Sequence, residues 1–161
     1  MRTLFDGRKH VLDAMVFINF HGVLLLEKLF QWSSSEIVLT PSVKKEASES
    51  KAGKISWDRY IKEGRVNFNP MKLPEEQRLF FEYLNKEIDG KVIHRGEASV
   101  LAVAIINGCG LACDEKVVRD EYKRATGLIG LHSWGLIDIA VQRGFLDEEY
   151  AESVKKGFYY V

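Results

Sequence analysis

Short apolar runs that alternate with longer helical patterns constrain the fold of this chain most strongly. Each run has the length and composition of a buried strand, and the segment after it has the apolar spacing of a helix. Strands that alternate with helices imply a parallel sheet whose two faces are covered. The sequence therefore predicts an α/β fold, a three-layer α/β/α sandwich with a mostly parallel sheet of about five strands.

The predicted elements follow one another without an obvious linker or repeat, so we expect a single domain over residues 1–161. The expected strands are 8–12, 36–39, 65–68, 111–113 and 128–131. The expected helices are 14–30, 42–50, 57–62, 74–88, 94–107, 115–125, 133–142 and 147–156. Thr40 and Pro41 are the N-cap and first-turn proline that begin the second of these helices.

Composition excludes some classes of protein. Lys plus Arg and Asp plus Glu number 23 each, so the net charge gives no bulk attraction to nucleic acid. Charged residues interrupt the first ten positions, and the apolar stretch 15–26 is shorter than the roughly 20 residues that span a bilayer. We therefore expect a cytoplasmic protein with no membrane partner, and we expect Cys109 and Cys113 to be small buried residues.

Four acidic residues stand where such a sheet would bring them together: Asp13, Glu46, Glu97 and Asp114. Asp13 and Asp114 end apolar runs, while Glu46 and Glu97 lie early in helices that follow strands. Right-handed crossovers place all strand ends on one rim, where ligands of open α/β sheets bind. Converged carboxylates repel one another and need a cation. A metal site for a phosphate-bearing substrate is therefore predicted.

Each acid also has a simpler interpretation. Asp114 could cap the helix that follows it, Glu97 could favour its helix dipole, and Glu46 could be a solvated surface carboxylate. Asp13 is harder to explain in this way, because it precedes an apolar helix in which an unpaired charge is costly. Gly96 marks a place where backbone must approach another group closely.

The joint pattern resembles the PIN-domain family of metal-dependent ribonucleases along most of the chain. The segment 11–19 is similar to the opening strand, acid and helix of that family, and 40–46 resembles its second acidic motif. The most specific match is 95–104, where Gly-Glu stands in place of the commoner aspartate. The segment 111–115 and the closing segments 130–135 and 144–146 resemble the remaining motifs.

The resemblance implies an all-oxygen site for Mg²⁺ or Mn²⁺. Its ligands would be Asp13, Glu97 and Asp114, with Glu115 as a further or alternate ligand. Glu46 would complete the cluster or orient the attacking water. Two ions about 3.5–4 Å apart could then activate a water and stabilise the leaving oxygen of a phosphodiester. The implied substrate is RNA.

Basic residues beside the acidic motifs are candidate contacts to RNA phosphates: Lys44, Lys45, Arg95, Lys116 and Arg119. An equally good interpretation is that they lie on solvated helix faces or pair with neighbouring acids. His132 and Ser133 follow the last expected strand and could reach the same rim, although a histidine beside a helix N-cap is a common structural feature.

The first motif departs from the family pattern. Members usually carry Ser, Thr or Asn shortly after the first acid, where this chain has Ala14 and Met15. Asn19 lies more than a helical turn further on, and we do not expect it to replace them. This departure favours an alternative, a non-catalytic PIN-like module that binds RNA or protein. A third alternative is another Mg²⁺-dependent phosphotransfer domain. It is weakened because this sequence has no Gly-rich phosphate loop after a strand.

Partners are also implied. Many members of the family are toxins of toxin–antitoxin pairs, so a cognate antitoxin is an expected partner besides RNA. The apolar segment 14–30 and the aromatic tail 158–160 favour a homodimer.

Overall fold

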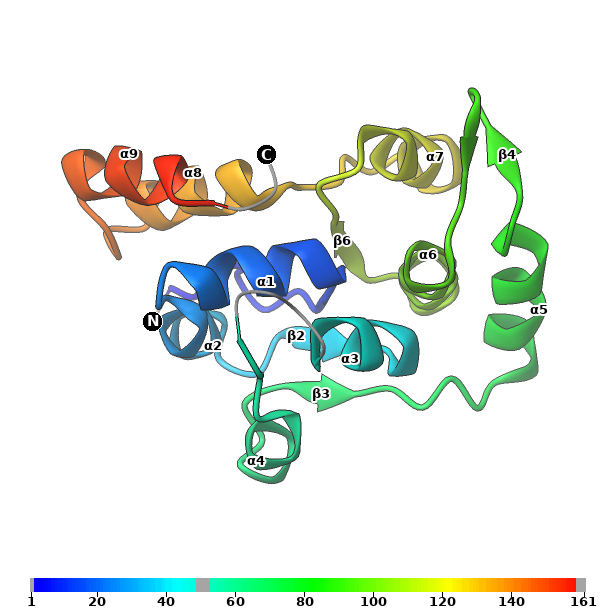
Figure 1. Cartoon of the computed structure of the whole chain (residues 1–161), viewed down its shortest axis with the longest axis horizontal. Coiled ribbons are helices and arrows are strands. Elements are labelled where there is room, and N and C mark those ends of the chain that lie inside the picture. The colour runs from blue at the N-terminus through cyan, green and yellow to red at the C-terminus, as the bar shows by residue number, and fades with distance from the viewer. Residues whose placement is uncertain (1, 49–52, 159–161) are drawn as a thin grey trace.

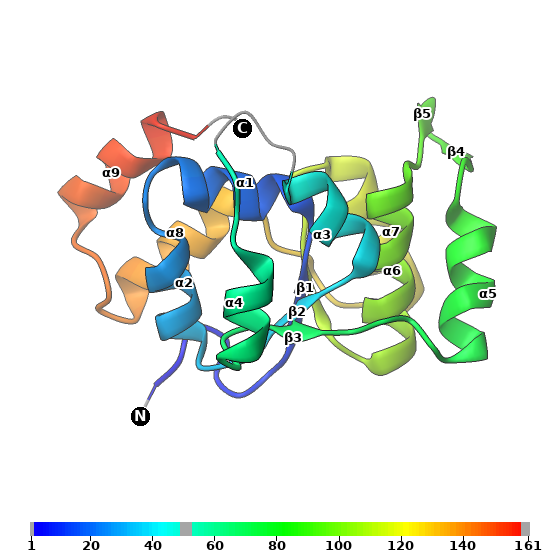
Figure 2. The same ribbon diagram turned by 60° about the horizontal axis from the view of Figure 1, so that its bottom comes forward.

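A four-stranded parallel sheet forms the centre of the fold. The computed structural model describes residues 2–48 and 53–158. Strands β1 (His10–Leu12), β2 (Ile37–Leu39), β3 (Asn67–Phe68) and β6 (Gly110–Ala112) lie in the order β3-β2-β1-β6. All three pairings are parallel, and helices pack on both faces of the sheet (Figures 1 and 2). The predicted α/β architecture is confirmed.

The strand order changes direction at β1. From β1 the chain proceeds outward through β2 to β3, and it then returns to place β6 on the other side of β1. In open α/β sheets, such a reversal leaves a crevice beyond the carboxyl ends of the two adjoining strands. Asp13 directly follows β1, and Asp114 lies two residues beyond β6. The topology therefore brings these two acids to one crevice.

The prediction of a fifth strand at 128–131 is wrong. Only Leu131 pairs with the sheet, through a parallel bridge to Ala112. The Leu131 amide donates to the Leu111 carbonyl at 2.8 Å, and the Cys113 amide donates to the Leu131 carbonyl at 2.8 Å. Helix α7 (Lys116–Thr126) ends only a few residues before this point, and α8 (Ser133–Gln142) begins two residues after it. Residues 128–130 form no bridge to the sheet, so the segment contributes a single pairing residue.

The predicted helix 14–30 is two helices. Helix α1 (Ala14–Gly22) and helix α2 (Leu26–Ser33) are bent by 117° relative to each other. Leu24 lies at the break with a φ of 63° and is 88% exposed. The other apolar side chains of this segment are buried or partly buried within the chain, so they do not supply the surface on which the homodimer was predicted.

No single helix in the described part of the chain is long and apolar enough to cross a membrane. Helices α1 and α2 reach that length and composition only as a bent pair. Most of their apolar residues belong to the core, so their composition is explained by burial in the protein interior.

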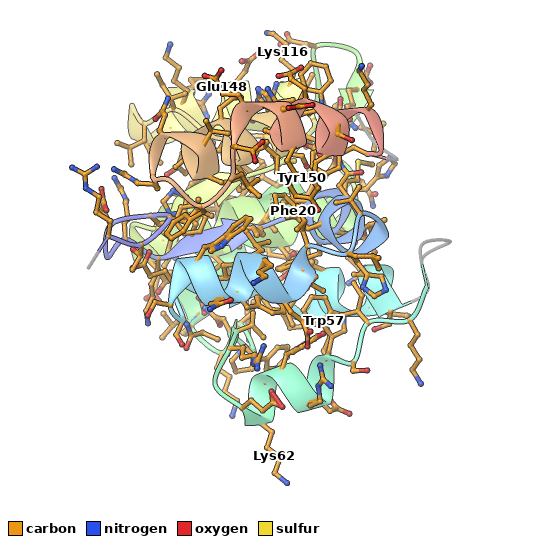
Figure 3. The ribbon with its side chains drawn as sticks, turned by 90° about the vertical axis from the view of Figure 1, so that its left-hand side faces the viewer. Phe20, Trp57, Lys62, Lys116, Glu148 and Tyr150 are labelled. Carbon is orange, nitrogen blue, oxygen red and sulfur yellow. The ribbon has the colours of Figure 1, made fainter. Side chains whose placement is uncertain are left out.

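Aromatic side chains join the outer helices to α1. Phe17 meets Trp57, the first residue of α4 (Trp57–Lys62), edge to face at a ring separation of 4.9 Å. Phe20 contacts Phe158, just beyond α9 (Glu148–Lys156), at 5.6 Å. Figure 3 shows Phe20 between the α8–α9 pair and the first helices, with Trp57 on the side of α4. Aromatic packing thus holds α1 to α4 and to the segment that follows α9.

Helices α3 (Pro41–Ser48) and α6 (Arg95–Asn107) begin next to each other and carry Glu46 and Glu97. As predicted, Thr40 caps α3, since its Oγ1 accepts from the Val43 amide at 3.3 Å. It also bonds to Ser99 Oγ of α6 at 2.7 Å, which ties the two helix starts together. The predicted ends of the helix at 49–50 and of the aromatic tail at 159–160 lie outside the described residues.

The predicted helix 74–88 is too long. Helix α5 (Pro74–Tyr83) ends early, and a two-residue hairpin follows, with β4 (Glu87–Ile88) antiparallel to β5 (Lys91–Val92). The turn residues Asp89 and Gly90 both have positive φ, 51° and 78°, which is the backbone that an Asp-Gly hairpin turn requires. The hairpin rises from α5 and leads directly into α6 (Figure 2).

Candidate active site

Asp13 lies at the bottom of the crevice. Its amide continues the ladder by donating to the Ala112 carbonyl at 2.9 Å, and the residue is only 3% exposed. Carboxylate Oδ2 accepts a hydrogen bond from Cys113 Sγ at 3.3 Å. Oδ1 is buried and, within the described residues, has no hydrogen-bond partner. A buried carboxylate oxygen without a partner is costly unless a cation or proton satisfies it.

Burial raises the pKa of Asp13 to about 7. The Ala14 amide opposes this shift, whereas the charges of Glu46 and Glu97 add to it. Burial also raises the pKa of Cys113 well above its ordinary value, and Asp13 raises it further, so Cys113 remains a thiol that can donate. Near neutral pH, Asp13 in the metal-free protein is therefore partly protonated.

Glu46 reaches the cluster across the first turn of α6. A Cβ atom built on Gly96 would lie 2.3 Å from Glu46 Oε1, so only glycine leaves room for this carboxylate. This confirms the predicted close approach at Gly96. Although Glu46 as a whole is exposed, partial burial of its carboxylate raises its pKa; the Gly96 amide lowers the pKa, and the charge of Glu97 raises it. The carboxylate end thus faces the other acids.

Asp114 is held by α1 and α8 instead of capping its own helix. Its Oδ1 accepts from the Ser133 amide at 2.6 Å, and its Oδ2 accepts from Ser133 Oγ at 2.6 Å and from Asn19 Nδ2 at 3.0 Å. The N-cap position of α7 is Glu115, whose side chain makes no capping bond. Asn19 was not expected to replace the polar residues missing after Asp13, yet this buried side chain bonds to both Asp114 and Ser133.

Lys91 of the hairpin lies between two further acids. Its Nζ is 3.1 Å from Glu97 Oε2 and 2.9 Å from Glu115 Oε2. The other oxygen of Glu97 accepts from the His94 amide at 2.9 Å and so closes the first turn of α6. Burial acts to lower the pKa of Lys91, but the hydrogen bonds that it donates to the carboxylates of Glu115 and Glu97 outweigh burial and raise the pKa. Lys91 is therefore an ammonium ion inside the cluster.

The donor set consists of carboxylate oxygens, which suit Mg²⁺ or Mn²⁺. Within residues 2–48 and 53–158, no three His, Cys, Asp or Glu side chains converge on one point in ligating geometry. Mg²⁺ commonly keeps several waters and binds through only one or two carboxylates. The unpartnered Oδ1 of Asp13, with Glu46 and Glu97 near enough to raise its pKa, fits an ion held in this way.

Most of the candidate phosphate contacts already have protein partners. Lys44 pairs with Asp58 at 3.3 Å, and Arg119 Nη1 donates to the Cys113 carbonyl at 2.8 Å. Lys116 pairs with Asp120 one helical turn away and extends into solvent (Figure 3). The two remaining candidates are Lys45, which is exposed, and Arg95, which is exposed and lies 5.6 Å over the Phe80 ring beside the acidic cluster.

Three residues of this site were missed in the sequence or given little weight: Asn19, Lys91 and Ser133. Lys91 could have been found, because Asp-Gly between Ile88 and Lys91 is a strong hairpin pattern. Ser133 was expected only to reach this rim, and it does so by bonding to Asp114. His132 accepts from the Gly135 amide at 3.3 Å, which is the structural N-cap role weighed for it.

Comparison with known proteins gives one match. A family model described as a PIN domain matches residues 9–157, nearly the whole chain. No curated protein and no solved structure matched the chain.

Proposed function

The chain belongs to the PIN-domain family, and from this premise we propose that it is a metal-dependent ribonuclease that hydrolyses RNA phosphodiester bonds. The observation that carries the proposal is the buried Asp13 carboxyl at the crevice between β1 and β6, whose Oδ1 has no hydrogen-bond partner in the part of the chain that the structure describes. Asp13 stands at the N-cap position of α1, but its side chain makes no capping bond there, and burial of its charge costs desolvation.

We propose that Asp13 holds a Mg²⁺ or Mn²⁺ ion, with Glu97 and Glu46 as its nearest acidic neighbours. When bound, such an ion lowers the pKa of a coordinated water and neutralises charge on a phosphate oxygen. Asp114 accepts three hydrogen bonds, and a carboxylate can accept about four, so it retains capacity for one more. Ser133 and Asn19 fix its orientation, so Asp114 is placed to orient a water or bind the ion.

The same arrangement weakens the case for a non-catalytic module. That alternative rests on Ala14 and Met15, whose side chains cannot hydrogen-bond to the acids as Ser, Thr or Asn would. Asn19 and Ser133 supply hydrogen bonds within the cluster from a different part of α1 and from α8. Asn19 and Ser133 therefore take the place of the polar residues that family members usually carry after the first acid, and they bind Asp114.

The proposed substrate is RNA, and Lys45 and Arg95 are the proposed phosphate contacts with no charged protein partner among the described residues. We also propose a cytoplasmic location, a cognate antitoxin and a homodimer, whose interface would use a surface other than the buried apolar segment 14–30. Expression of the active protein should then arrest growth, and expression of Asp13→Asn should not. Arrest by both proteins would contradict a toxin that acts through this site.

The direct test of the function is cleavage of a mixed-sequence single-stranded RNA, with single-stranded DNA of the same sequence as a control. We expect cleavage that requires Mg²⁺ or Mn²⁺, stops on chelation and falls by at least about 100-fold in Asp13→Asn and Asp114→Asn. Asp120→Asn is the matched control, since this carboxylate is exposed and pairs only with Lys116 among the described residues. Metal binding without cleavage of any RNA would favour the binding module.

A further inference from the structure

One side chain in the acidic cluster has a charge opposite to the rest. Among the described residues, the side chains that gather at the crevice are Asp13, Glu46, Glu97, Asp114, Glu115 and Lys91. Lys91 Nζ bonds to one oxygen of each of two acids on different helices, at 3.1 Å and 2.9 Å. Its side chain is 26% exposed and that of Glu97 only 7%, so this contact is not an ordinary surface ion pair.

The β4–β5 hairpin fixes the position of Lys91 between these two acids. The β4–β5 hairpin contains two residue pairs, and its Asp-Gly turn fixes the register so that Lys91 opposes Ile88. From this strand, Lys91 reaches Glu97 in the first turn of α6 and Glu115 at the start of α7. Without the hairpin, Glu97 and Glu115 would face each other with no cation between them, which is unfavourable at this depth.

The acids therefore divide into two groups. Glu97 Oε2 and Glu115 Oε2 share the Lys91 ammonium, whereas Asp13 Oδ1 has no partner among the described residues. A two-ion nuclease site would need a divalent cation in each of the two positions. In this chain one of them is already filled by a charge that belongs to the protein.

We propose that Lys91 is a resident cation that replaces one of the two metal ions, so that the site takes a single divalent ion beside Asp13. This inference rests on the proposed metal-dependent function and specifies the metal content of that site. Lys91 is a charge-compensating residue: its ammonium binds one oxygen of Glu97 and one of Glu115, and it presents positive charge at the crevice where a phosphate would enter.

The experiment counts Mn²⁺ bound at saturation by equilibrium dialysis of the full chain. We expect one ion per chain for the wild type and for Lys91→Arg, which keeps the charge. We expect two ions for Lys91→Met and for Lys91→Gln, because the freed carboxylates of Glu97 and Glu115 gain a divalent ion. Lys116→Met is the matched control, since it removes a neighbouring lysine that is 77% exposed and pairs with Asp120; it should bind one ion.

A second arm locates the added ion. Lys91→Met combined with Glu115→Gln removes one of the two freed ligands, so this double variant should return to one ion per chain. Melting curves in chelator provide an independent readout: Lys91→Met should melt below the wild type without metal and should gain more from Mn²⁺ than the wild type gains. Circular dichroism of each variant establishes that the count refers to folded protein.

The outcomes separate the two claims. Two ions on the wild type, or one ion on a folded Lys91→Met and on Lys91→Gln, would overturn the role of Lys91 and leave a metal-dependent nuclease intact. No ion on the wild type would contradict the metal-dependent function itself, and the inference about Lys91 with it. Two ions on Lys116→Met would show that any lost lysine adds a site and would likewise overturn the inference.

Discussion

Replacing Asp13 by asparagine should make the metal-free protein more stable. The side chains have the same shape, but asparagine carries no charge that burial penalises. Burial holds the pKa of Asp13 at about 7, compared with 3.8 in an unfolded chain. Between these values the native state binds a proton that the unfolded state has lost, so stability falls as pH rises through this range. Above about pH 7 the full cost is present.

The size of the effect follows from the shift. A difference of about three pKa units corresponds to about 4 kcal/mol, which is an upper limit on the stability lost by the wild type at about pH 8. At about pH 5 the corresponding limit is about 2 kcal/mol, because this pH lies only about one unit above the unfolded-state pKa of 3.8. For a chain of this length each kcal/mol shifts the melting temperature by about 2–4 °C.

The assay is thermal unfolding in chelator and in Mn²⁺ across this pH range. In chelator, Asp13→Asn should melt above the wild type, and the difference should grow with pH until it levels off near pH 7. In Mn²⁺ the wild type should gain stability while the variant does not. Asp120→Asn should change stability by less than about 0.5 kcal/mol. An Asp13→Asn protein that is less stable in chelator at every pH would refute this account of Asp13.

Three further predictions concern the same cluster. Gly96→Ala should weaken Mn²⁺ binding by about tenfold with little change in melting temperature, because the added Cβ displaces the flexible carboxylate of Glu46; dialysis measures this, and unchanged affinity would contradict it. Asn19→Ala should lower the urea-unfolding free energy by about 1–3 kcal/mol and slow RNA cleavage, since Asp114 loses a buried donor; activity equal to wild type would show that Asn19 does not position that acid. Mn²⁺ affinity should fall about tenfold per pH unit below about pH 7, as the ion must displace the Asp13 proton; calorimetry in two buffers should detect the released proton, and pH-independent affinity would contradict it.

The parallel sheet and the position of two acids could be predicted from the sequence because they depend on local pattern. Apolar runs define β1 and β6, and parallel pairing then puts Asp13 and Asp114 at one edge whatever the details of the connections. Gly96 was predictable for the same reason, since a glycine beside an acid in a first helical turn indicates close approach.

The remaining features depend on contacts between distant segments. Asn19 is 95 residues from Asp114, and nothing in its own neighbourhood indicates that partner. The break at Leu24 requires a positive φ that leucine does not indicate. The hairpin that carries Lys91 was missed because the apolar spacing of α5 appeared to continue through Leu84, although the Asp-Gly turn was visible.

A crystal soaked in Mn²⁺ and measured at the manganese absorption edge would show whether these acids hold a metal ion. We predict one anomalous peak within about 2 Å of Asp13 Oδ1, with Lys91 still between Glu97 and Glu115. A protein that shows no peak at this crevice, or a peak only at unrelated surface carboxylates, would contradict the proposal that these acids form a metal-dependent active site.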